Sequence, residues 1–249
     1  MIELEAANTG KVLAIGHRGA LGYAPENTMA SFQLAVEMRV DVIELDIHMT
    51  RDGALVVMHD GNVARTTDGQ GHIKEMTLAE VKALDAGARF SPRFRGERVP
   101  TLAEVLAWAR GRIQLAIEVK GDPMPATGIE DKLVTLLRDQ SMVDSVIAIS
   151  FHHPVVRRLK ELEPALATGI LYCARLADSV GAARAALADS LRPDWQYWTA
   201  DLVRTVHEAG LTASTWNADD EPLMEYLVGL GVDSIGSNYP DRLRALLGE

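Results

Sequence analysis

The sequence predicts an α/β protein folded as a (β/α)8 (TIM) barrel, and three observations support this expectation. Eight short apolar runs recur along the chain, and segments with helical spacing of apolar residues lie between most of them. The chain has 249 residues, 47% of them hydrophobic, which suits a single domain over residues 1–249. The main alternative is a doubly wound open sheet, but its glycine-rich dinucleotide turn is missing after the first strand.

The first strand is expected at residues 12–15, where a short apolar run ends at the turn 16–19, Gly-His-Arg-Gly. The two glycines permit a tight bend and a close backbone approach. Asn27 or Thr28 then caps a helix, and the chain enters a second strand at residues 40–46. This order forms a βαβ unit, which implies a right-handed parallel crossover.

Segment 42–60 has two apolar runs on either side of Arg-Asp-Gly at 51–53. Asp-Gly between such runs is typical of a β-hairpin. In the first run Glu44, Asp46 and His48 fall on alternate positions, so their side chains share one face of the strand. Acidic residues inside an apolar strand are costly to bury unless something binds them, so this face is a candidate site.

A turn centred on the Asp-Gly pair predicts how the two arms of the hairpin align. It places Thr50 opposite Leu55 and Asp46 opposite His59. This register would bring carboxylates and an imidazole together.

Residues 61–111 lack any long strand-like run, and we expect there a small helical insertion after the hairpin of the second strand. Thr77 and Thr101 each begin a Thr-Leu-Ala-Glu sequence, a capping box that starts a helix. The loop between these helices, residues 89–100, carries two phenylalanines and four arginines. We interpret the segment at about 61–111 as an insertion or lid that covers a site.

Strand-like and helix-like runs alternate from residue 113 to the end of the chain. Strands are expected at 114–119, 145–151, 167–172, 190–192, 211–216 and 234–237. Helices are expected between them at 129–140, 154–162, 180–187, 201–209 and 221–230. Together with the first two strands, these runs give eight parallel strands and complete the barrel.

Polar side chains stand near the predicted carboxyl ends of these strands, where (β/α)8 barrels place their reactive groups. They are His17 and Arg18, Glu44 and Asp46, Glu118 and Lys120, with His59 returning from the hairpin. Each has an ordinary structural explanation when taken alone, such as a histidine beside a glycine turn. Their coincidence on one rim predicts a catalytic site.

Glu44, Asp46 and Glu118 offer three hard oxygen ligands, and neither a cysteine nor a His-x-His pair accompanies them. Such a set suits Mg2+, Ca2+ or Mn2+ better than Zn2+. Without a cation, three clustered carboxylates would repel one another and take up protons. We therefore expect one divalent metal ion, Mg2+ or Ca2+, with Mn2+ as a further option.

The remaining rim residues suit a phosphate ester. Arg18 offers a planar fork of donors for a phosphate oxygen, and Lys120 offers a point charge. His17 and His59 then provide two groups for proton transfer, one to activate a nucleophile and one to protonate a leaving oxygen. This inventory predicts phosphodiester cleavage.

The bulk properties exclude several partner classes. The formal net charge of -10 and the pI near 5.2 argue against binding to nucleic acid or to an anionic lipid surface. No run approaches the roughly 20 apolar residues of a membrane span. The N-terminal stretch has acids where a signal peptide needs bases, and the lone Cys173 fits a reducing compartment. We expect a cytoplasmic protein without stable membrane association.

Several motifs in order resemble those of the glycerophosphodiester phosphodiesterases, in particular the short bacterial cytosolic type. They are His17-Arg18-Gly19, Ala-Pro-Glu-Asn-Thr at 24–28, Glu44-Leu45-Asp46, His59-Asp60 and Glu118-Val119-Lys120. Further similarity at 66–69, 150–151 and 239–243 extends the resemblance almost from end to end.

The resemblance implies a (β/α)8 barrel with a small insertion, and metal-dependent hydrolysis of glycerophosphodiesters to sn-glycerol 3-phosphate and an alcohol. It also implies a role for each matching residue. These are Glu44, Asp46 and Glu118 as metal ligands, His17 and His59 as the acid/base pair, and Arg18 and Lys120 as contacts of the phosphate or substrate.

The chain departs from the family pattern near its end. The family often has Trp-Thr-Val-Asn late in the barrel, whereas residues 214–217 read Ser-Thr-Trp-Asn. A shift by two keeps Trp216 on the same strand face, where it walls the glycerol pocket or packs in the core. Ser237-Asn238 stands in place of the more usual Thr-Asp. We expect Glu26 to orient Arg18 or a loop amide.

Two other functions remain as alternatives. One is lipid-directed cleavage by a lysophospholipase D or a phosphoinositide-type phosphodiesterase, for which the loop with Phe90 and Phe94 is the candidate entry surface. The other is a non-catalytic phosphate-binding barrel, which would be expected to lack an acid/base histidine. The helices show no heptad pattern, so the oligomeric state is left open.

Overall fold

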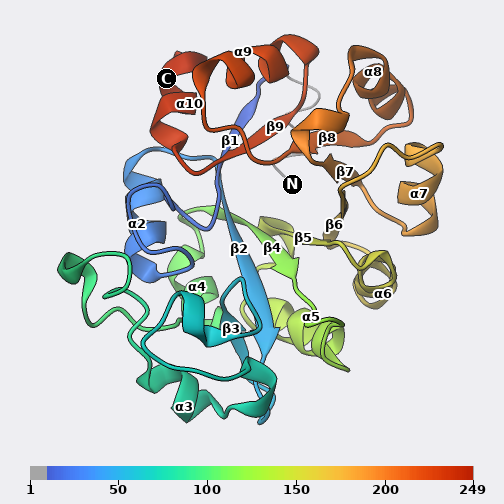
Figure 1. Ribbon diagram of the computed structural model, residues 1–249. Helices are drawn as coiled ribbons and strands as arrows, with labels where there is room; N and C mark the ends of the chain where they lie inside the picture. The colour runs from blue at the N-terminus through green and yellow to red at the C-terminus, as the bar shows by residue number, and fades with distance from the viewer. Residues whose placement is uncertain (1–9, 249) are drawn as a thin grey trace.

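Within the described residues 10–248 of this computed structural model, eight parallel strands close into a barrel, which confirms the predicted fold (Figure 1). The strands are β1 (Leu13–Gly16), β2 (Val42–Met49), β4 (Gln114–Val119), β5 (Val146–Ser150), β6 (Ala167–Tyr172), β7 (Ser190–Pro193), β8 (Thr212–Thr215) and β9 (Ser234–Ser237). Neighbours follow the order β1-β9-β8-β7-β6-β5-β4-β2, and β1 also pairs with β2 to close the ring. Residues 1–9, which hold the acidic N-terminal stretch, and residue 249 lie outside the described part of the predicted domain.

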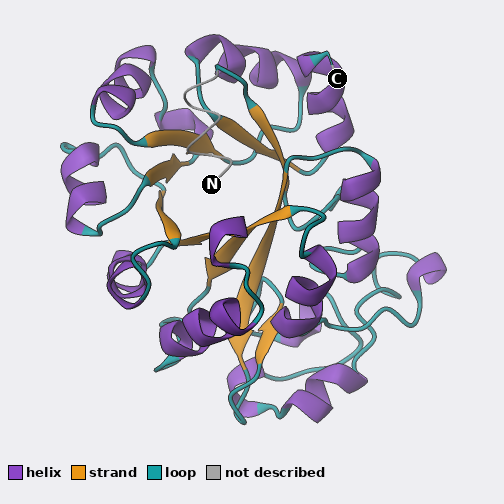
Figure 2. Ribbon diagram, turned by 180° about the vertical axis from the view of Figure 1, so that it is seen from behind, coloured by secondary structure: helices purple, strands orange, loops and turns teal. Residues whose placement is uncertain are grey.

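Helices surround the strands as an outer layer (Figure 2). They are α2 (Met29–Glu37), α4 (Leu102–Ala109), α5 (Ile129–Asp139), α6 (His153–Leu162), α7 (Ser179–Ala185), α8 (Ala200–Glu208), α9 (Glu221–Leu230) and α10 (Pro240–Leu247). The sequence analysis did not predict α10, which starts with a proline in its first turn. Among the described residues, no helix has the length and apolar character needed to cross a membrane.

The alternation of side chains along β2 sets the location of the acids. Ile43 and Leu45 belong to the large core between strands and helices. Val42 belongs instead to a second core inside the barrel, together with Ile15. Because alternate residues share a face, Glu44 and Asp46 also point inward. The buried face of β2 therefore carries both carboxylates toward the barrel axis.

The predicted register of the hairpin is wrong by one residue. Strand β3 (Leu55–Val57) pairs antiparallel with β2, with Met49 opposite Leu55 and Ile47 opposite Val57. The N–H of Met58, and not that of His59, donates to the carbonyl of Asp46 at 3.0 Å. The cause is the turn, which has three residues because Gly53 adopts a left-handed φ of 82°.

The insertion between β3 and α4 is shorter than predicted and forms a lobe beside β3 (Figure 1). It contains α3 (Leu78–Ala83) and the 3-10 helices η1 (Val63–Arg65), η2 (Ile73–Glu75) and η3 (Pro92–Phe94). A small core that includes Val63, Ile73 and Val81 holds it together. Helix α4, which lies within the predicted segment 61–111, packs instead through Leu102 and Leu106 into the barrel core. Both predicted capping boxes are present.

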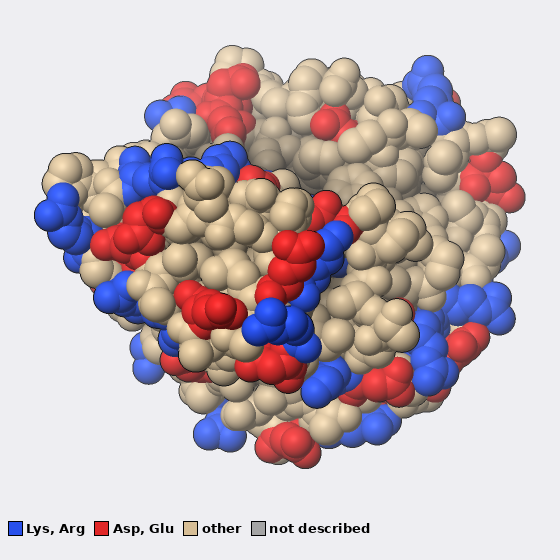
Figure 3. Space-filling model, turned by 60° about the horizontal axis from the view of Figure 1, so that its bottom comes forward, with Lys and Arg blue, Asp and Glu red and all other residues tan. Residues whose placement is uncertain are grey.

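Acidic and basic side chains are interspersed on the face shown in Figure 3. That face therefore does not present the continuous basic surface that a phosphate polymer requires.

Candidate active site

A pocket opens at the carboxyl ends of the strands, and each of the eight parallel strands contributes to its wall. The strand residues at the wall are Ile15, Glu44, Glu118, Ile149, Leu171, Arg192, Thr215 and Gly236. Residues that follow the strands complete it: His17, Arg18, His59, Lys120, Phe151, Trp216 and Asn217. The pocket is thus the mouth of the barrel, which is where the candidate residues were predicted to lie.

Glu44, Asp46 and Glu118 form a buried carboxylate cluster whose donor oxygens lie within 4.8 Å of one another. The parallel register explains the grouping, because Asp46 pairs with Glu118 on the neighbouring strand. Burial and the charge of Asp46 raise the pKa of Glu44 well above its usual value, and the same causes raise the pKa of Glu118 to about 7. Ionising all three carboxylates at the same time is therefore unfavourable unless a further positive charge is bound among them.

The cluster fits a hard divalent cation. All its donors are oxygens, the ligands that Mg2+ and Ca2+ prefer. The Oδ1 atom of Asp46 is buried and accepts no hydrogen bond from the residues described. A buried carboxylate oxygen without a donor is expected where a metal is bound.

Two cations border the cluster. The Nε atom of Arg18 lies 3.3 Å from Oδ2 of Asp46, and the Nζ atom of Lys120 lies 2.8 Å from Oε1 of Glu118. Although burial of Asp46 opposes ionisation, Arg18 and Lys120 outweigh it and lower the pKa of Asp46. Glu26 accepts a hydrogen bond from Arg18 at 2.9 Å, the contact expected for a residue that orients this arginine.

The local backbone turns Arg18 into the pocket. Its φ is 52°, which is uncommon for a residue with a side chain. The backbone N–H of Arg18 donates to Oε2 of Glu44 at 2.9 Å, and its carbonyl accepts from the hydroxyl of Ser31. Gly19 follows with a φ of 88°, and a Cβ there would collide with Ser31. The Gly-His-Arg-Gly turn thus fixes Arg18 against the carboxylates.

Each candidate histidine has an acceptor beside Nδ1, and the amide nitrogen of Asn217 also lies 3.1 Å from Nδ1 and 3.4 Å from Nε2 of His17. The Nδ1 atom of His17 lies 2.6 Å from the amide oxygen of Asn238, and Nδ1 of His59 lies 2.6 Å from Oδ1 of Asp60. Since these partners are acceptors, each Nδ1 donates, and each Nε2 is left as the basic atom. Burial, followed by the charge of Arg18, lowers the pKa of His17 to about 4. Burial also lowers the pKa of His59.

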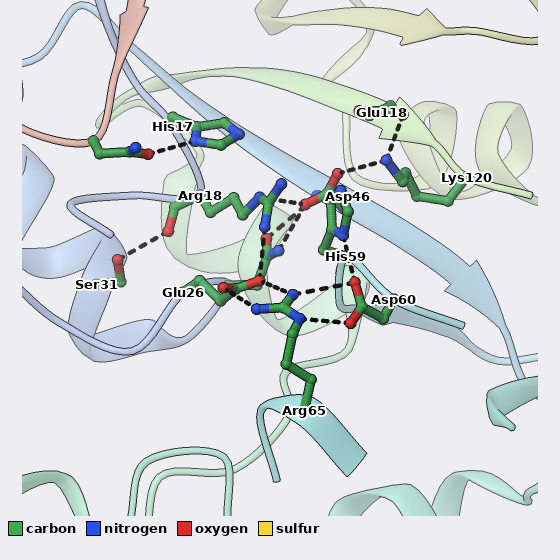
Figure 4. A network of polar contacts seen from close by, with 12 residues as sticks. His17, Arg18, Glu26, Ser31, Asp46, His59, Asp60, Arg65, Glu118 and Lys120 are labelled. Carbon is green, nitrogen blue, oxygen red and sulfur yellow. Dashed lines mark hydrogen bonds and ion pairs between the residues drawn. The ribbon is translucent and has the colours of Figure 1, made fainter. Parts of the chain in front are cut away.

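Trp216 stands in the pocket wall. Its indole N–H donates to the carbonyl of Arg192 at 2.9 Å, and its ring meets Phe151 edge to face at 5.6 Å between centroids. The other candidate site residues lie in the same region. Figure 4 shows His17, Arg18, Glu26, Asp46, His59, Glu118 and Lys120 together, and Glu44 lines the pocket with Trp216. His48 is not among the lining residues, and its Nε2 contacts the carbonyl of His59 instead.

Asn27, Asn238 and Arg192 are among the site residues that were not predicted from the sequence. Asn27 donates from its amide to Oδ2 of Asp46 at 2.8 Å. Asn238 anchors His17, although the two are 221 residues apart in the sequence. Arg192 lines the pocket from the strand predicted at 190–192. The motif at 24–28 contained the signal for Asn27, and period-two alternation from Ser190 would have indicated Arg192.

Comparison with known proteins extends over nearly the whole chain. Residues 17–242 match the model of the glycerophosphoryl diester phosphodiesterase family. A glycerophosphodiester phosphodiesterase of Caldanaerobacter subterraneus subsp. tengcongensis is 39% identical over 234 residues, 94% of this chain and 96% of the relative. The structure of an Oleispira antarctica phosphodiesterase in complex with the product sn-glycerol-3-phosphate is similar, with a TM-score of 0.89, 29% identity and coverage of 98% and 99%. A glycerophosphodiester phosphodiesterase of Agrobacterium tumefaciens gives a TM-score of 0.84 at 30% identity, covering 94% and 100%.

Proposed function

The chain belongs to the glycerophosphoryl diester phosphodiesterase family, and from that premise we propose that it hydrolyses glycerophosphodiesters to sn-glycerol 3-phosphate and an alcohol. One observation carries the proposal. A buried carboxylate cluster, two cations and two anchored imidazoles share one pocket, which is the inventory that phosphodiester cleavage requires. The solved relative with sn-glycerol-3-phosphate bound supports the product class.

Glu44, Asp46 and Glu118 would hold one divalent ion, and their oxygen donors favour Mg2+ or Ca2+, with Mn2+ as a further option. When bound, such an ion supplies Lewis-acid chemistry by drawing electron density from a phosphoryl oxygen. It would also offset the two causes that raise the pKa values of Glu44 and Glu118, which are burial and, after it, the charge of Asp46.

Arg18 and Lys120 would bind the non-bridging phosphate oxygens. Arg18 is held by Glu26 and Asp46 on one side, and its guanidinium lines the pocket. Its planar fork suits two oxygens of one phosphate, whereas the ammonium group of Lys120 supplies a point charge. Trp216 would form an apolar wall for the carbon face of glycerol.

His17 and His59 would transfer the protons. The Nε2 atom of one histidine takes a proton from the nucleophile, either the glycerol 2-hydroxyl or a water molecule. The Nε2 atom of the other gives a proton to the departing alkoxide. Asn238 and Asp60 fix the two rings by accepting from Nδ1, so that both basic nitrogens stay available.

A lipid-directed phosphodiesterase is the second candidate, and two phenylalanines of the insertion, the exposed Phe90 and the partly buried Phe94, favour it. Phe90 is 44% exposed and meets Phe94 edge to face at 5.7 Å between centroids. Such a pair can contact an acyl chain. A comparison of glycerophosphocholine with lysophosphatidylcholine as substrates distinguishes the two functions.

Choline release from the two substrates gives this comparison. We expect kcat/KM to be about tenfold or more higher for glycerophosphocholine, because the charged residues of the pocket favour free glycerol hydroxyls over an acylated glycerol. Both substrates must be used below the micellar concentration, so that aggregation does not limit access. An equal or higher kcat/KM for lysophosphatidylcholine would favour the lipid-directed function instead.

A further inference from the structure

Arg65 connects the insertion to two carboxylates at the edge of the pocket. It is the last residue of η1, and Figure 4 shows its guanidinium between Glu26 and Asp60. Toward Glu26 it donates from NH1 to Oε2 at 2.8 Å and from NH2 to Oε1 at 2.7 Å. Toward Asp60 it donates from Nε to Oδ2 at 2.6 Å and from NH2 to Oδ1 at 3.1 Å. One side chain thus makes two forked ion pairs.

Both carboxylates lead directly to groups with a role in the proposed reaction. Oε1 of Glu26 also accepts from NH1 of Arg18 at 2.9 Å. Oδ1 of Asp60 also accepts from Nδ1 of His59 at 2.6 Å. A continuous chain of contacts therefore joins the phosphate-binding cation to a proton-transfer imidazole, with Arg65 at its centre.

We propose that Arg65 is a positioning residue, and that the insertion acts as a brace which holds Arg18 and His59 at a fixed separation. The inference rests on the proposed function, because it assigns the two braced groups to phosphate binding and proton transfer. Only an arginine can fill this position, since three nitrogens of one planar group are used at once. A lysine would reach one carboxylate at a time.

The two carboxylates that Arg65 contacts, Glu26 and Asp60, both favour their ionised form. Burial opposes ionisation of Asp60, but the hydrogen bonds from Arg65 and His59 outweigh it and lower its pKa to about 2. Burial of Glu26 is outweighed in the same way by Arg65 and Arg18, which lower its pKa. Both carboxylates therefore stay ionised and able to accept hydrogen bonds at neutral pH.

A role in global stability is the competing explanation, and the exposure of Arg65 argues against it. The Arg65 side chain is 48% exposed, and without it the buried partner Glu26, 9% exposed, still pairs with Arg18 at 2.9 Å. Its removal should consequently affect turnover more than unfolding. This difference separates a positioning role from a structural one.

The test compares Arg65→Met and Arg65→Lys with the wild-type protein on glycerophosphocholine. We expect kcat to fall about 10- to 100-fold in Arg65→Met, as for other residues that orient catalytic groups, with partial recovery in Arg65→Lys. The thermal midpoint should be nearly unchanged. Arg51→Met is the matched control, because Arg51 is an exposed arginine whose guanidinium lies 3.8 Å from Glu80, and its kcat should equal that of the wild type.

Two further readouts show through which group Arg65 acts. In a double-mutant cycle, adding Arg65→Met to Asp60→Asn should lower kcat much less than it does in the wild type. In NMR spectra, the Nδ1 proton of His59 should be shifted and broadened in Arg65→Met, and this signal does not depend on activity. An inactive wild-type protein would overturn the proposed function. A wild-type kcat or an unchanged His59 signal in Arg65→Met would overturn the brace.

Discussion

Replacement of His17 or His59 by alanine is expected to lower kcat for glycerophosphocholine by about 10²- to 10⁴-fold. Each ring lines the pocket, and its Nδ1 contacts Asn238 in His17 and Asp60 in His59. Because proton removal and proton donation occur in one turnover, neither histidine can replace the other. Steady-state kinetics on the purified variants, with circular dichroism to verify the fold, measure the effect.

His207→Ala is the matched control for these variants. His207 lies on the outer helix α8, pairs with Asp233 at 2.9 Å and is not a lining residue of the pocket. Its kcat should stay within about twofold of the wild type. If a folded His17→Ala or His59→Ala protein keeps more than about a tenth of the wild-type kcat, that histidine is not part of the acid/base pair.

Replacement of Asp46 by asparagine is expected to have the second large effect. The side chain is 1% exposed and lies between Arg18 and Lys120, at the centre of the carboxylate cluster. The substitution keeps the shape but removes the charge and one of the two carboxylate oxygens, of which Oδ1 accepts no hydrogen bond from the described residues and lies 3.6 Å from Nζ of Lys120. Metal affinity should fall strongly, and kcat should fall by about 10³-fold or more, because Lewis-acid stabilisation is worth several kcal/mol.

Calorimetric titration of the metal-free protein with Mg2+ or Ca2+ measures this loss without reference to activity. Glu163→Gln serves as the control, since Glu163 pairs with Arg138 on the outer surface and takes no part in the cluster. Wild-type metal affinity in Asp46→Asn would show that the ion is not held by this cluster.

The grouping of the candidate residues was largely predictable, because the patterns that indicate it are local. Alternation along one strand places Glu44 and Asp46 on one face, and the same rule applied to the neighbouring strand adds Glu118. Capping boxes at Thr77 and Thr101 are local too, and both helices begin there. Parallel strands in a barrel end at one rim, so these local patterns converge in space.

The errors arise where local patterns are ambiguous. An Asp-Gly pair is compatible with turns of two or three residues, and only the backbone conformation of Gly53 distinguishes them. His59 nevertheless lines the pocket, because the chain leaves the strand after Val57. Helix α4 was included in the predicted insertion because its apolar sequence is equally compatible with packing inside the insertion and with packing against the barrel. Its packing into the barrel core depends on tertiary structure.

Contacts between distant parts of the chain could not be predicted from the sequence. Asn238 meets His17 across 221 residues, and Arg65 meets Glu26 across 39. A single sequence contains no periodicity that links such positions. Both contacts fix the orientation of a reactive group, so the supporting residues were less predictable than the groups that they support.

Release of sn-glycerol 3-phosphate from glycerophosphocholine by the wild-type protein, measured with and without EDTA, tests metal-dependent phosphodiesterase activity most directly. We expect rapid release that EDTA abolishes and that an excess of Mg2+ or Ca2+ restores. A different phosphorylated product, or full activity in EDTA, would contradict the proposed function.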